Sequence, residues 1–330
     1  MTRPVFVQLT SLVFRIRIHW ETHLNYITPD FWYGRNGVSS CTSLLPGSRS
    51  AARSTPTSTE IEAATASLPT IRDPRFGRVV VVRERFIVKY GTHVLENEGF
   101  ALLFLEEHPS IPAPRLYAMY REDGNLYLVM EFKSGRDLDG LWSDLSEDEK
   151  ISILGQLKSI WDEMRSIPAQ GFLGNVTRGP LQHRFFLWRE AEPKITGPFE
   201  KEEDLDLALA LRSQLIWESN QRRGWTSEFF ARHLPVVLKG HRSTFTHADL
   251  HRKNILIEKL PAEGYAERRF RVSAIVDWEM AGWYPSYWEY ASCFVDFQWT
   301  EDWPEKVEYI LDTWPLEAAM LRMVRQDLEF

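Results

Sequence analysis

Cysteine is scarce in this sequence. Cys41 and Cys293 are the two cysteines among 330 residues, and they lie far apart in unlike contexts. We therefore expect neither a disulfide framework nor a cysteine-ligated zinc site. The scarcity fits a reducing compartment, for which we predict the cytoplasm.

Long hydrophobic runs are also absent. No apolar stretch reaches the roughly 18 residues that a membrane-spanning helix needs, so we expect no membrane partner. The short run VFVQLTSLVF at 5–14 is followed by basic residues and has no clear small-residue cleavage site, which disfavours a secretory signal. The basic residues would also suit a mitochondrial presequence, but Glu21 and the aromatics around it weaken that interpretation.

An excess of positive charge is lacking as well. Lysine and arginine number 39 against 46 acidic residues, for a net charge of −7, and no long basic stripe occurs. A broad nucleic-acid-binding surface is therefore not expected. A nucleotide-binding P-loop is also missing, because Pro180 follows the Gly174–Gly179 spacing where that motif requires lysine.

The composition predicts where order begins. Hydrophobic residues make up 44% and charged residues 26%, which is typical of a packed globular protein. Residues 39–70, by contrast, are dominated by Ser, Thr, Ala, Pro and Gly, which indicates a mobile linker. We therefore expect residues 1–67 to be an N-terminal extension with a disordered linker, and order to begin near Leu68.

Residues 68–132 predict a small antiparallel sheet with one inserted helix. A helix over 94–108 ends at Pro109, and it carries Glu98 on its apolar face. A carboxylate in that position needs a partner, and the nearest upstream candidate is Lys89. Runs of β-branched and aromatic residues predict four strands, at 79–82, 86–91, 116–120 and 126–132.

Residues 133–330 are expected to be mostly helical. Ser146 and Glu149 have the spacing of a capping box at the start of an apolar stripe that continues to Pro168. Further helices are predicted at 203–220, 226–238, 303–313 and 316–327.

Within this helical part, the stretch FTHADLHRKNILIEK at 245–259 concentrates polar side chains just before a strand. Asn254 opens that strand, and a second strand at 270–276 runs into Asp277. A hairpin of the two would bring Asn254 and Asp277 close together, with Asp249 in the loop before them. Such oxygen ligands suit Mg²⁺, and one carboxylate is left to accept a hydrogen bond from an attacking hydroxyl.

The segment HADLHRKN at 247–254 resembles the catalytic loop His-x-Asp-x-x-x-x-Asn of the protein-kinase-like superfamily. Ala248 after the histidine, and Asp277–Trp278–Glu279 in place of Asp-Phe-Gly, resemble the aminoglycoside and choline phosphotransferases. The segments ENEGFALLFLEEHPSIPAPRL and IVDWEMAGWYPSYWEY are most similar to fungal-type phosphotransferase domain proteins. The resemblance covers about residues 70 to 330, and it implies an α+β bilobal fold with a sheet-based nucleotide-binding lobe (68–132) and a mainly helical catalytic lobe (133–330).

The resemblance also implies a role for each matching residue. Asp249 would act as the catalytic base, and Asn254 and Asp277 would bind Mg²⁺. Lys89 would contact the α- and β-phosphates, and Glu98 would hold Lys89 in place.

Five further positions complete this assignment. The backbone at Met130, Glu131 and Phe132 would bind the purine. Glu279 would support the metal site, and His247 would brace the catalytic loop and not act as a base. One feature departs from the superfamily pattern, because no Gly-x-Gly-x-x-Gly precedes Lys89. The resemblance then implies that the 72–78 segment, around its glycine, covers the phosphates.

The expected function is transfer of the γ-phosphoryl group of ATP or GTP to a hydroxyl of a small molecule. The alternative is a catalytically silent fold that binds nucleotide or a protein partner. A protein kinase is disfavoured because no Ala-Pro-Glu follows Asp277. The sequence assigns neither the acceptor nor an oligomeric state. One cluster allows either a cage for a cationic or ring substrate or core packing, which we favour: Trp278, Trp283, Tyr284, Tyr287, Trp288 and Tyr290.

Overall fold

The computed structural model describes residues 55–68, 74, 76–188, 192–261, 269–296 and 302–329. The expected extension therefore lies outside the described residues up to position 54, as does most of the 72–78 segment before Phe76. Within the described ranges, no helix has the length and apolar character that crossing a membrane requires.

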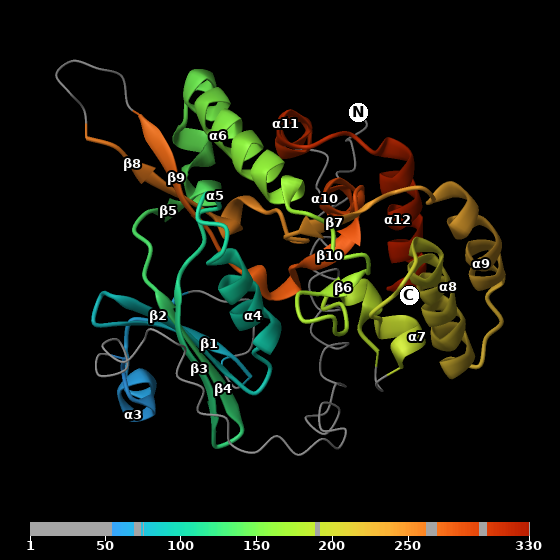
Figure 1. Ribbon diagram of the computed structural model, residues 1–330, viewed down its shortest axis with the longest axis horizontal. Coiled ribbons are helices and arrows are strands. Elements are labelled where there is room, and N and C mark those ends of the chain that lie inside the picture. Colours follow the sequence, from blue (N-terminus) through green and yellow to red (C-terminus); the bar gives the residue numbers. More distant parts are fainter. Residues whose placement is uncertain are drawn as a thin grey trace, which may run out of the picture. The chain divides into compact units, whose positions relative to one another are not determined.

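The first part of the described chain forms a four-stranded antiparallel sheet (Figure 1). All four predicted strands are present. Arg83 and Glu84 have φ values of 55° and 50°, which produces a tight turn between the first two strands. The strands occur in the order β1-β2-β4-β3: β1 (Arg78–Val82), β2 (Phe86–Gly91), β4 (Asn125–Glu131) and β3 (Leu116–Glu122).

The two faces of this sheet are covered differently. Because side chains alternate along a strand, Val88 and Tyr90 point to one face of β2 while Lys89 points to the other. The helix α4 (Glu96–Leu105) packs on β3 and buries Ala101, Leu102 and Leu105 in the main core. The predicted helix is thus present and ends before Pro109.

The opposite face carries an element that the sequence did not predict. The short helix α3 (Ser58–Glu62) is capped by Thr57 and buries Ile61 completely against Val80 and its neighbours in the sheet. Ser67 forms an isolated antiparallel bridge with Val80. The expectation of disorder up to residue 67 is therefore wrong from Thr55 onward. A five-residue helix with one large apolar side chain shows no detectable period, and the sheet surface that it covers comes from elsewhere in the chain.

The rest of the chain combines helices with two small sheets. The predicted helices are all present, and Ser146 and Glu149 make the expected capping box. The helices are α5 (Leu138–Leu141), α6 (Glu147–Ser166), α7 (Pro193–Thr196), α8 (Glu202–Ser219), α9 (Trp225–Val237), α10 (Trp288–Asp296), α11 (Trp303–Ile310) and α12 (Pro315–Leu328). The sheets have the orders β6-β10-β7 and β5-β8-β9, with β6 (Gly174–Asn175), β10 (Gly282–Pro285), β7 (Ser243–Thr246), β5 (Arg136–Asp137), β8 (Ile255–Lys259) and β9 (Phe270–Ile275).

The aromatic cluster around β10 and α10 fills the core of this helical part. Its rings pack on one another and on neighbouring side chains, as the stacked pair Tyr284 and Trp288 shows. The preferred interpretation as core packing is therefore confirmed, because buried rings present no open cage. The exposed fraction is at most 3% for every member: Trp278, Trp283, Tyr284, Tyr287, Trp288 and Tyr290.

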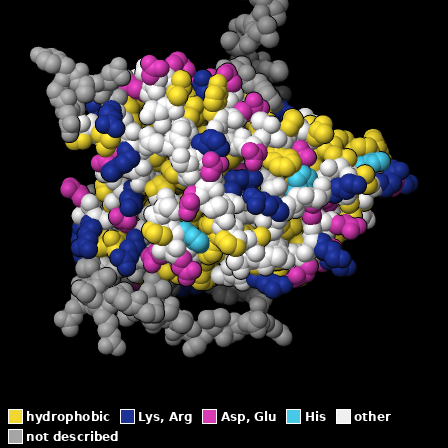
Figure 2. All heavy atoms as spheres, turned by 45° about the horizontal axis from the view of Figure 1, so that its top comes forward, with side chains coloured by type: hydrophobic (Ala, Val, Ile, Leu, Met, Phe, Trp, Pro, Cys, Tyr) yellow, Lys and Arg dark blue, Asp and Glu magenta, His cyan; other side chains and the backbone are white. Residues whose placement is uncertain are grey.

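On the face drawn in Figure 2, lysine and arginine side chains are interspersed with acidic ones. This face therefore offers no broad basic field to nucleic acid.

Candidate active site

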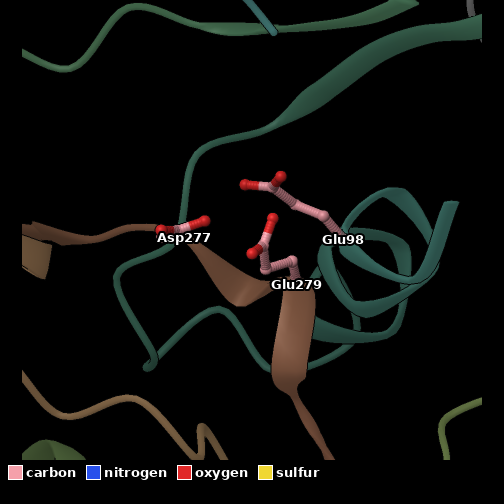
Figure 3. Close-up of side chains that lie close together, drawn as sticks. All are labelled: Glu98, Asp277 and Glu279. Atoms are coloured by element: carbon pink, nitrogen blue, oxygen red, sulfur yellow. The ribbon is translucent and has the colours of Figure 1, made fainter. Parts of the chain in front are cut away.

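Lys89 lies at the centre of a carboxylate cluster. Its ammonium nitrogen is 2.8 Å from a carboxylate oxygen of each of Glu98, Asp277 and Glu279. The three acidic side chains come from α4 and from the segment after β9, and their carboxylates point toward one another (Figure 3). The structure thus brings together residues separated by as many as 190 positions.

Burial sets the electrostatics of this cluster. Burial raises the pKa of Glu98 to about 7 against the opposing charge of Lys89, and the carboxylates of Asp277 and Glu279 contribute to the rise. The side chain of Asp277 is by contrast 39% exposed. Asp277 is therefore the member of the cluster that an incoming ligand can reach.

Asn97 joins this cluster to α4, and the sequence analysis missed it. Its side-chain amide donates to the carbonyl oxygens of Glu279 and Ala281 at 2.8 and 2.9 Å. Asn97 is 4% exposed, and it directly precedes Glu98 in α4. It therefore fixes the Glu279 backbone against the helix that holds Lys89. Its place between two acidic residues in ENEG was the available signal.

Asp249 and Asn254 face each other across the loop at 247–254. The Asn254 side-chain amide donates to the Asp249 carboxylate at 2.9 Å and to its carbonyl at 3.0 Å. His251 Nε2 lies 3.2 Å from the other carboxylate oxygen. Burial raises the pKa of Asp249, while the nearby His251 acts to lower it. Asp249 is thus an oriented carboxylate whose proton affinity is increased.

The predicted hairpin brings Asn254 and Asp277 to the same edge. β8 pairs with β9 in antiparallel register, with Ile255 opposite Ile275. The Val276 amide donates to the Asn254 carbonyl at 2.9 Å, directly before Asp277. Asp277 has the left-handed φ of 65°, which aspartate tolerates better than most residues, and this turns the chain sharply at the strand end.

His247 braces the loop through both ring nitrogens. Nδ1 accepts the Asp249 amide hydrogen at 3.2 Å, so Nε2 must carry the proton that binds the Val276 carbonyl at 3.0 Å. This is the neutral tautomer, held in a residue with 0% exposure. Both nitrogens of His247 are therefore occupied in the fold, in keeping with the bracing position expected of it.

Glu289 supports the same loop through its carboxylate. Its Oε2 accepts the amides of His247 at 2.8 Å and Ala248 at 3.3 Å, and the residue is 0% exposed. Ala248 has a φ of 66°, so these two amides point in one direction. A buried carboxylate in α10 therefore helps to fix the loop that carries Asp249. The sequence offered only an acidic residue among aromatics as a signal.

Arg252 ties the loop to the helices beside it. Its guanidinium lies 5.5 Å from the centroid of Trp142 and 5.8 Å from that of Trp303, and 3.0 Å from the Asp139 carboxylate. It lies in the 3-10 turn η5 (Arg252–Asn254), between the positions of Asp249 and Asn254. This clamp was not predicted, because nothing in HADLHRKN indicates which rings surround the arginine.

The expected purine contact needs correction at two of its amides. The Glu131 amide donates to the Arg115 carbonyl and the Phe132 amide to the Arg85 carbonyl, each at 2.9 Å. Met130 is paired within the sheet. These two amides already bind neighbouring backbone and are not available to a purine. The purine contact at Met130, Glu131 and Phe132 otherwise stays a prediction.

The described end of the 72–78 segment lies against Gly91. A Cβ at Gly91 would come within 2.3 Å of the Phe76 carbonyl oxygen, and the Phe76 and His93 rings are stacked at 4.5 Å. The close approach requires glycine, since φ there is 145°. This contact places Gly77 near the strand that carries Lys89.

Comparison with known proteins gives the family. A model described as the phosphotransferase enzyme family matches residues 72–322, which is more than half of the chain. The chain belongs to the phosphotransferase enzyme family. No curated protein matches the sequence.

Solved structures confirm the fold of this family member. A thermostable mutant of aminoglycoside phosphotransferase APH(4)-Ia, in ternary complex with AMP-PNP and hygromycin B, is 19% identical, with a TM-score of 0.51, covering 82% of this chain and 90% of that one. ADP-bound aminoglycoside phosphotransferase APH(2'')-Ib is 15% identical, with a TM-score of 0.50, covering 80% and 79%. The predicted α+β protein-kinase-like fold and the assignment to a phosphotransferase enzyme are confirmed.

The donor atoms of this phosphotransferase fit the magnesium ion that such a fold implies. Asn254 uses its amide nitrogen to bind Asp249, which leaves its carbonyl oxygen as the atom for a cation, and Asp277 adds a half-exposed carboxylate. Both are hard oxygen ligands. The group formed by Glu98, Asp277 and Glu279 also has metal-like spacing, but the Lys89 ammonium sits among its oxygens. Glu279 therefore supports the site through Lys89.

Proposed function

We propose that this enzyme transfers the γ-phosphoryl group of ATP or GTP to a hydroxyl group of a small molecule. The observation that carries the proposal is the 2.8 Å distance between the Lys89 ammonium and the Asp277 carboxylate. Asp277 follows the end of β9, and β9 pairs with β8, the strand that begins directly after the loop with Asp249 and Asn254. Adjoining elements thus carry the three groups that the reaction needs: a cation for the phosphates, a pair of oxygen ligands for a metal, and a carboxylate for the acceptor. The proposal includes a nucleotide-binding lobe that ends at 132.

Lys89 and Glu98 prepare the phosphate site. Three carboxylates hold the ammonium, and the Glu98 carboxylate keeps it in place from α4. A triphosphate would give Lys89 a further anionic partner close to Asp277. Asn254 and Asp277 would hold Mg²⁺, which supplies neutralisation of the phosphate charge when it is bound.

Asp249 receives the acceptor. Its carboxylate is oriented by Asn254 and His251, so it can accept the hydrogen bond of a hydroxyl. The hydroxyl oxygen forms a bond to the γ-phosphorus, the bond from that phosphorus to the β–γ bridging oxygen breaks, and ADP or GDP leaves. The hydroxyl proton passes to Asp249, whose raised pKa favours its acceptance.

The test is nucleotide binding followed by turnover. We expect ATP or GTP to raise the melting temperature of the wild-type protein more with Mg²⁺ than without it. Radiolabelled γ-phosphate should then appear on a hydroxyl compound. If neither nucleotide shifts the melting temperature under either condition, the catalytically silent fold is the better interpretation.

A further inference from the structure

The segment that follows the four-stranded sheet folds back onto the loop at 247–254. Its strand β5 pairs antiparallel with β8, which places Asp137 opposite Leu256 near the start of β8. The Asp137 carboxylate then caps α5 by accepting a backbone amide at 2.7 Å. In Figure 1, β5 and α5 accordingly lie beside β8. The short helix α5, which carries Asp139, is thereby fixed next to the end of the loop.

Arg252 reaches from the loop to this helix. Its guanidinium lies 3.0 Å from the Asp139 carboxylate, and its side chain is only 15% exposed. The centroids of the Trp142 and Trp303 rings are 5.5 and 5.8 Å from the guanidinium carbon. A planar guanidinium can pair with a carboxylate and pack on aromatic rings at the same time. These partners together restrict the orientation of the Arg252 side chain.

The groups around Arg252 are themselves anchored. Trp142 and Trp303 are buried, and their rings meet edge to face at 5.3 Å. The Trp142 indole donates to the Asp302 carboxylate at 2.8 Å, and Asp302 directly precedes α11. The same Asp302 oxygen lies 3.9 Å from an Arg252 nitrogen, which is longer than a hydrogen bond. The guanidinium is therefore held from α5 and from the start of α11, so a movement of the loop would have to break these contacts.

Arg252 is also close along the chain to Asn254, one of the two Mg²⁺ ligands of the proposed function. Both residues belong to the 3-10 turn η5, in which the Asn254 amide donates to the His251 carbonyl at 2.9 Å. Asp277, the other proposed ligand, lies on a separate segment after β9. The separation of the two ligands therefore depends on where η5 lies. Loss of Arg252 would change this separation without removing either ligand.

We propose that Arg252 is a positioning residue for the metal site, which couples the segment after the four-stranded sheet, through Asp139, to the turn that carries Asn254. This inference rests on the proposed function and names a residue that sets the geometry of its metal site. Arg252 acts through Asn254 and is not itself a ligand. Its loss should weaken the part of the nucleotide affinity that depends on Mg²⁺. The part that Lys89 supplies should remain, because carboxylates of α4 and of the segment after β9 hold that ammonium.

The experiment measures nucleotide affinity with and without the metal. The full-length protein is titrated calorimetrically in Mg²⁺ and in EDTA with ADP or GDP, whichever binds the wild type more tightly. Arg252→Gln should weaken the affinity about tenfold in Mg²⁺, as for residues that orient metal ligands, and less than about twofold in EDTA. Arg252→Lys keeps the charge but not the planar fork and should lie between. The control Arg271→Gln should match the wild type, since Arg271 lies in the β8–β9 hairpin, is 61% exposed and pairs with Glu258.

Asp139→Asn tests the partner of Arg252. It should cause a smaller loss of the same kind, and the double variant should be no worse than Arg252→Gln, because both changes remove one shared contact. Equal losses in Mg²⁺ and EDTA, wild-type affinity in Arg252→Gln, or additive losses in the double variant would each overturn the proposal. If Arg252→Gln does not fold, Arg252→Lys and Asp139→Asn decide by the same comparison of Mg²⁺ with EDTA.

Hydrogen exchange in the nucleotide-free protein separates this inference from the proposed function. The amides of residues 250–257 should exchange several-fold faster in Arg252→Gln than in the wild type, and those of β2 should not change. Wild-type affinity that depends on Mg²⁺, together with unchanged exchange at 250–257, would overturn the positioning role and leave the proposed function standing. Wild-type affinity that ignores Mg²⁺ would reject the metal site of the proposed function, and with it the effect of Arg252 on nucleotide binding.

Discussion

Two regions of this molecule place charged side chains in opposite proportions. Around Lys89, three carboxylates surround one ammonium group. The pocket beside Asp249 is lined by that one carboxylate together with an arginine and two histidines. In the proposed function, the first region would bind the nucleotide phosphates through Lys89, and the second would receive the acceptor hydroxyl at Asp249. Under the proposed function, the two substrates would therefore meet different sets of charged groups.

The two regions also differ in how they are held. The Lys89 cluster joins α4 to the turn after β9 through side chains, including Asn97. The Asp249 loop is held mainly through its backbone, by His247 and Glu289. Changes in the first region should therefore act on nucleotide binding, and changes in the second on catalysis.

The largest effect is expected at Asp249. Asp249→Asn removes the proton acceptor while keeping a similar shape, so turnover should fall by about 10²–10⁴-fold. Nucleotide affinity should stay nearly unchanged, since the Lys89 cluster is intact. Steady-state kinetics with a melting-temperature titration of Mg-ATP measures both quantities. A parallel loss of nucleotide binding would contradict the assigned role.

The next largest effect is expected at Asp277, in the Lys89 cluster. Asp277→Ala removes the exposed member of the Lys89 cluster and should weaken Mg²⁺-dependent nucleotide binding by roughly tenfold or more. The matched control is Asp162→Ala, an exposed acid in α6 paired with Lys158. Calorimetric titration with and without Mg²⁺ is the measurement. Equal wild-type affinity in both conditions would remove the metal assignment.

Removing Glu289 tests the backbone support of the loop. Glu289→Ala leaves two buried amides without an acceptor, which should lower the free energy of unfolding by about 1–3 kcal/mol per lost partner. Glu289→Gln keeps an acceptor oxygen and should be milder in both stability and kcat. Urea denaturation and kinetics on both variants separate the two. Equal damage from Ala and Gln would mean that the negative charge, and not the acceptor, is what the loop requires.

The smallest effect is expected at Asp206, an acidic residue outside both regions. Asp206 is fully buried, neither of its carboxylate oxygens has a hydrogen-bond partner among the described residues, and burial raises its pKa to about 9. Because the folded state then binds more protons than the unfolded state between about pH 4 and 9, stability should fall as pH rises through that range.

Asp206→Asn should remove this pH dependence and raise the free energy of unfolding near pH 8 by at least about 1 kcal/mol, the equivalent of one pKa unit. Turnover should not change. Urea denaturation at several pH values checks it, and an unaltered pH profile would show that Asp206 does not titrate in this way. A raised pKa alone therefore does not mark a functional site.

The sequence by itself determined the longer helices, the strands of the first sheet and the order of the candidate site residues. Strands such as 79–82 and 86–91 alternate or consist of β-branched residues, and the capping box at Ser146 and Glu149 is a local interaction. The spacing from Asp249 to Asn254 is likewise local. Hydrogen bonds and periodicity within about ten residues leave their pattern directly in the chain.

Only the tertiary structure decided which distant groups meet. The Arg115 and Arg85 carbonyls accept hydrogen bonds from the Glu131 and Phe132 amides, and no sequence pattern near residue 131 predicts this. The support of the 247–254 loop by Glu289, and the presence of Arg184 and Asp249 at one pocket, depend on the packing of α10 and of the 3-10 turn η4 (Arg184–Phe186). The contacts of Phe132 and Glu289 join residues more than 40 positions apart. The identity of such contacts is fixed by the whole fold because each element must bury its apolar face at once.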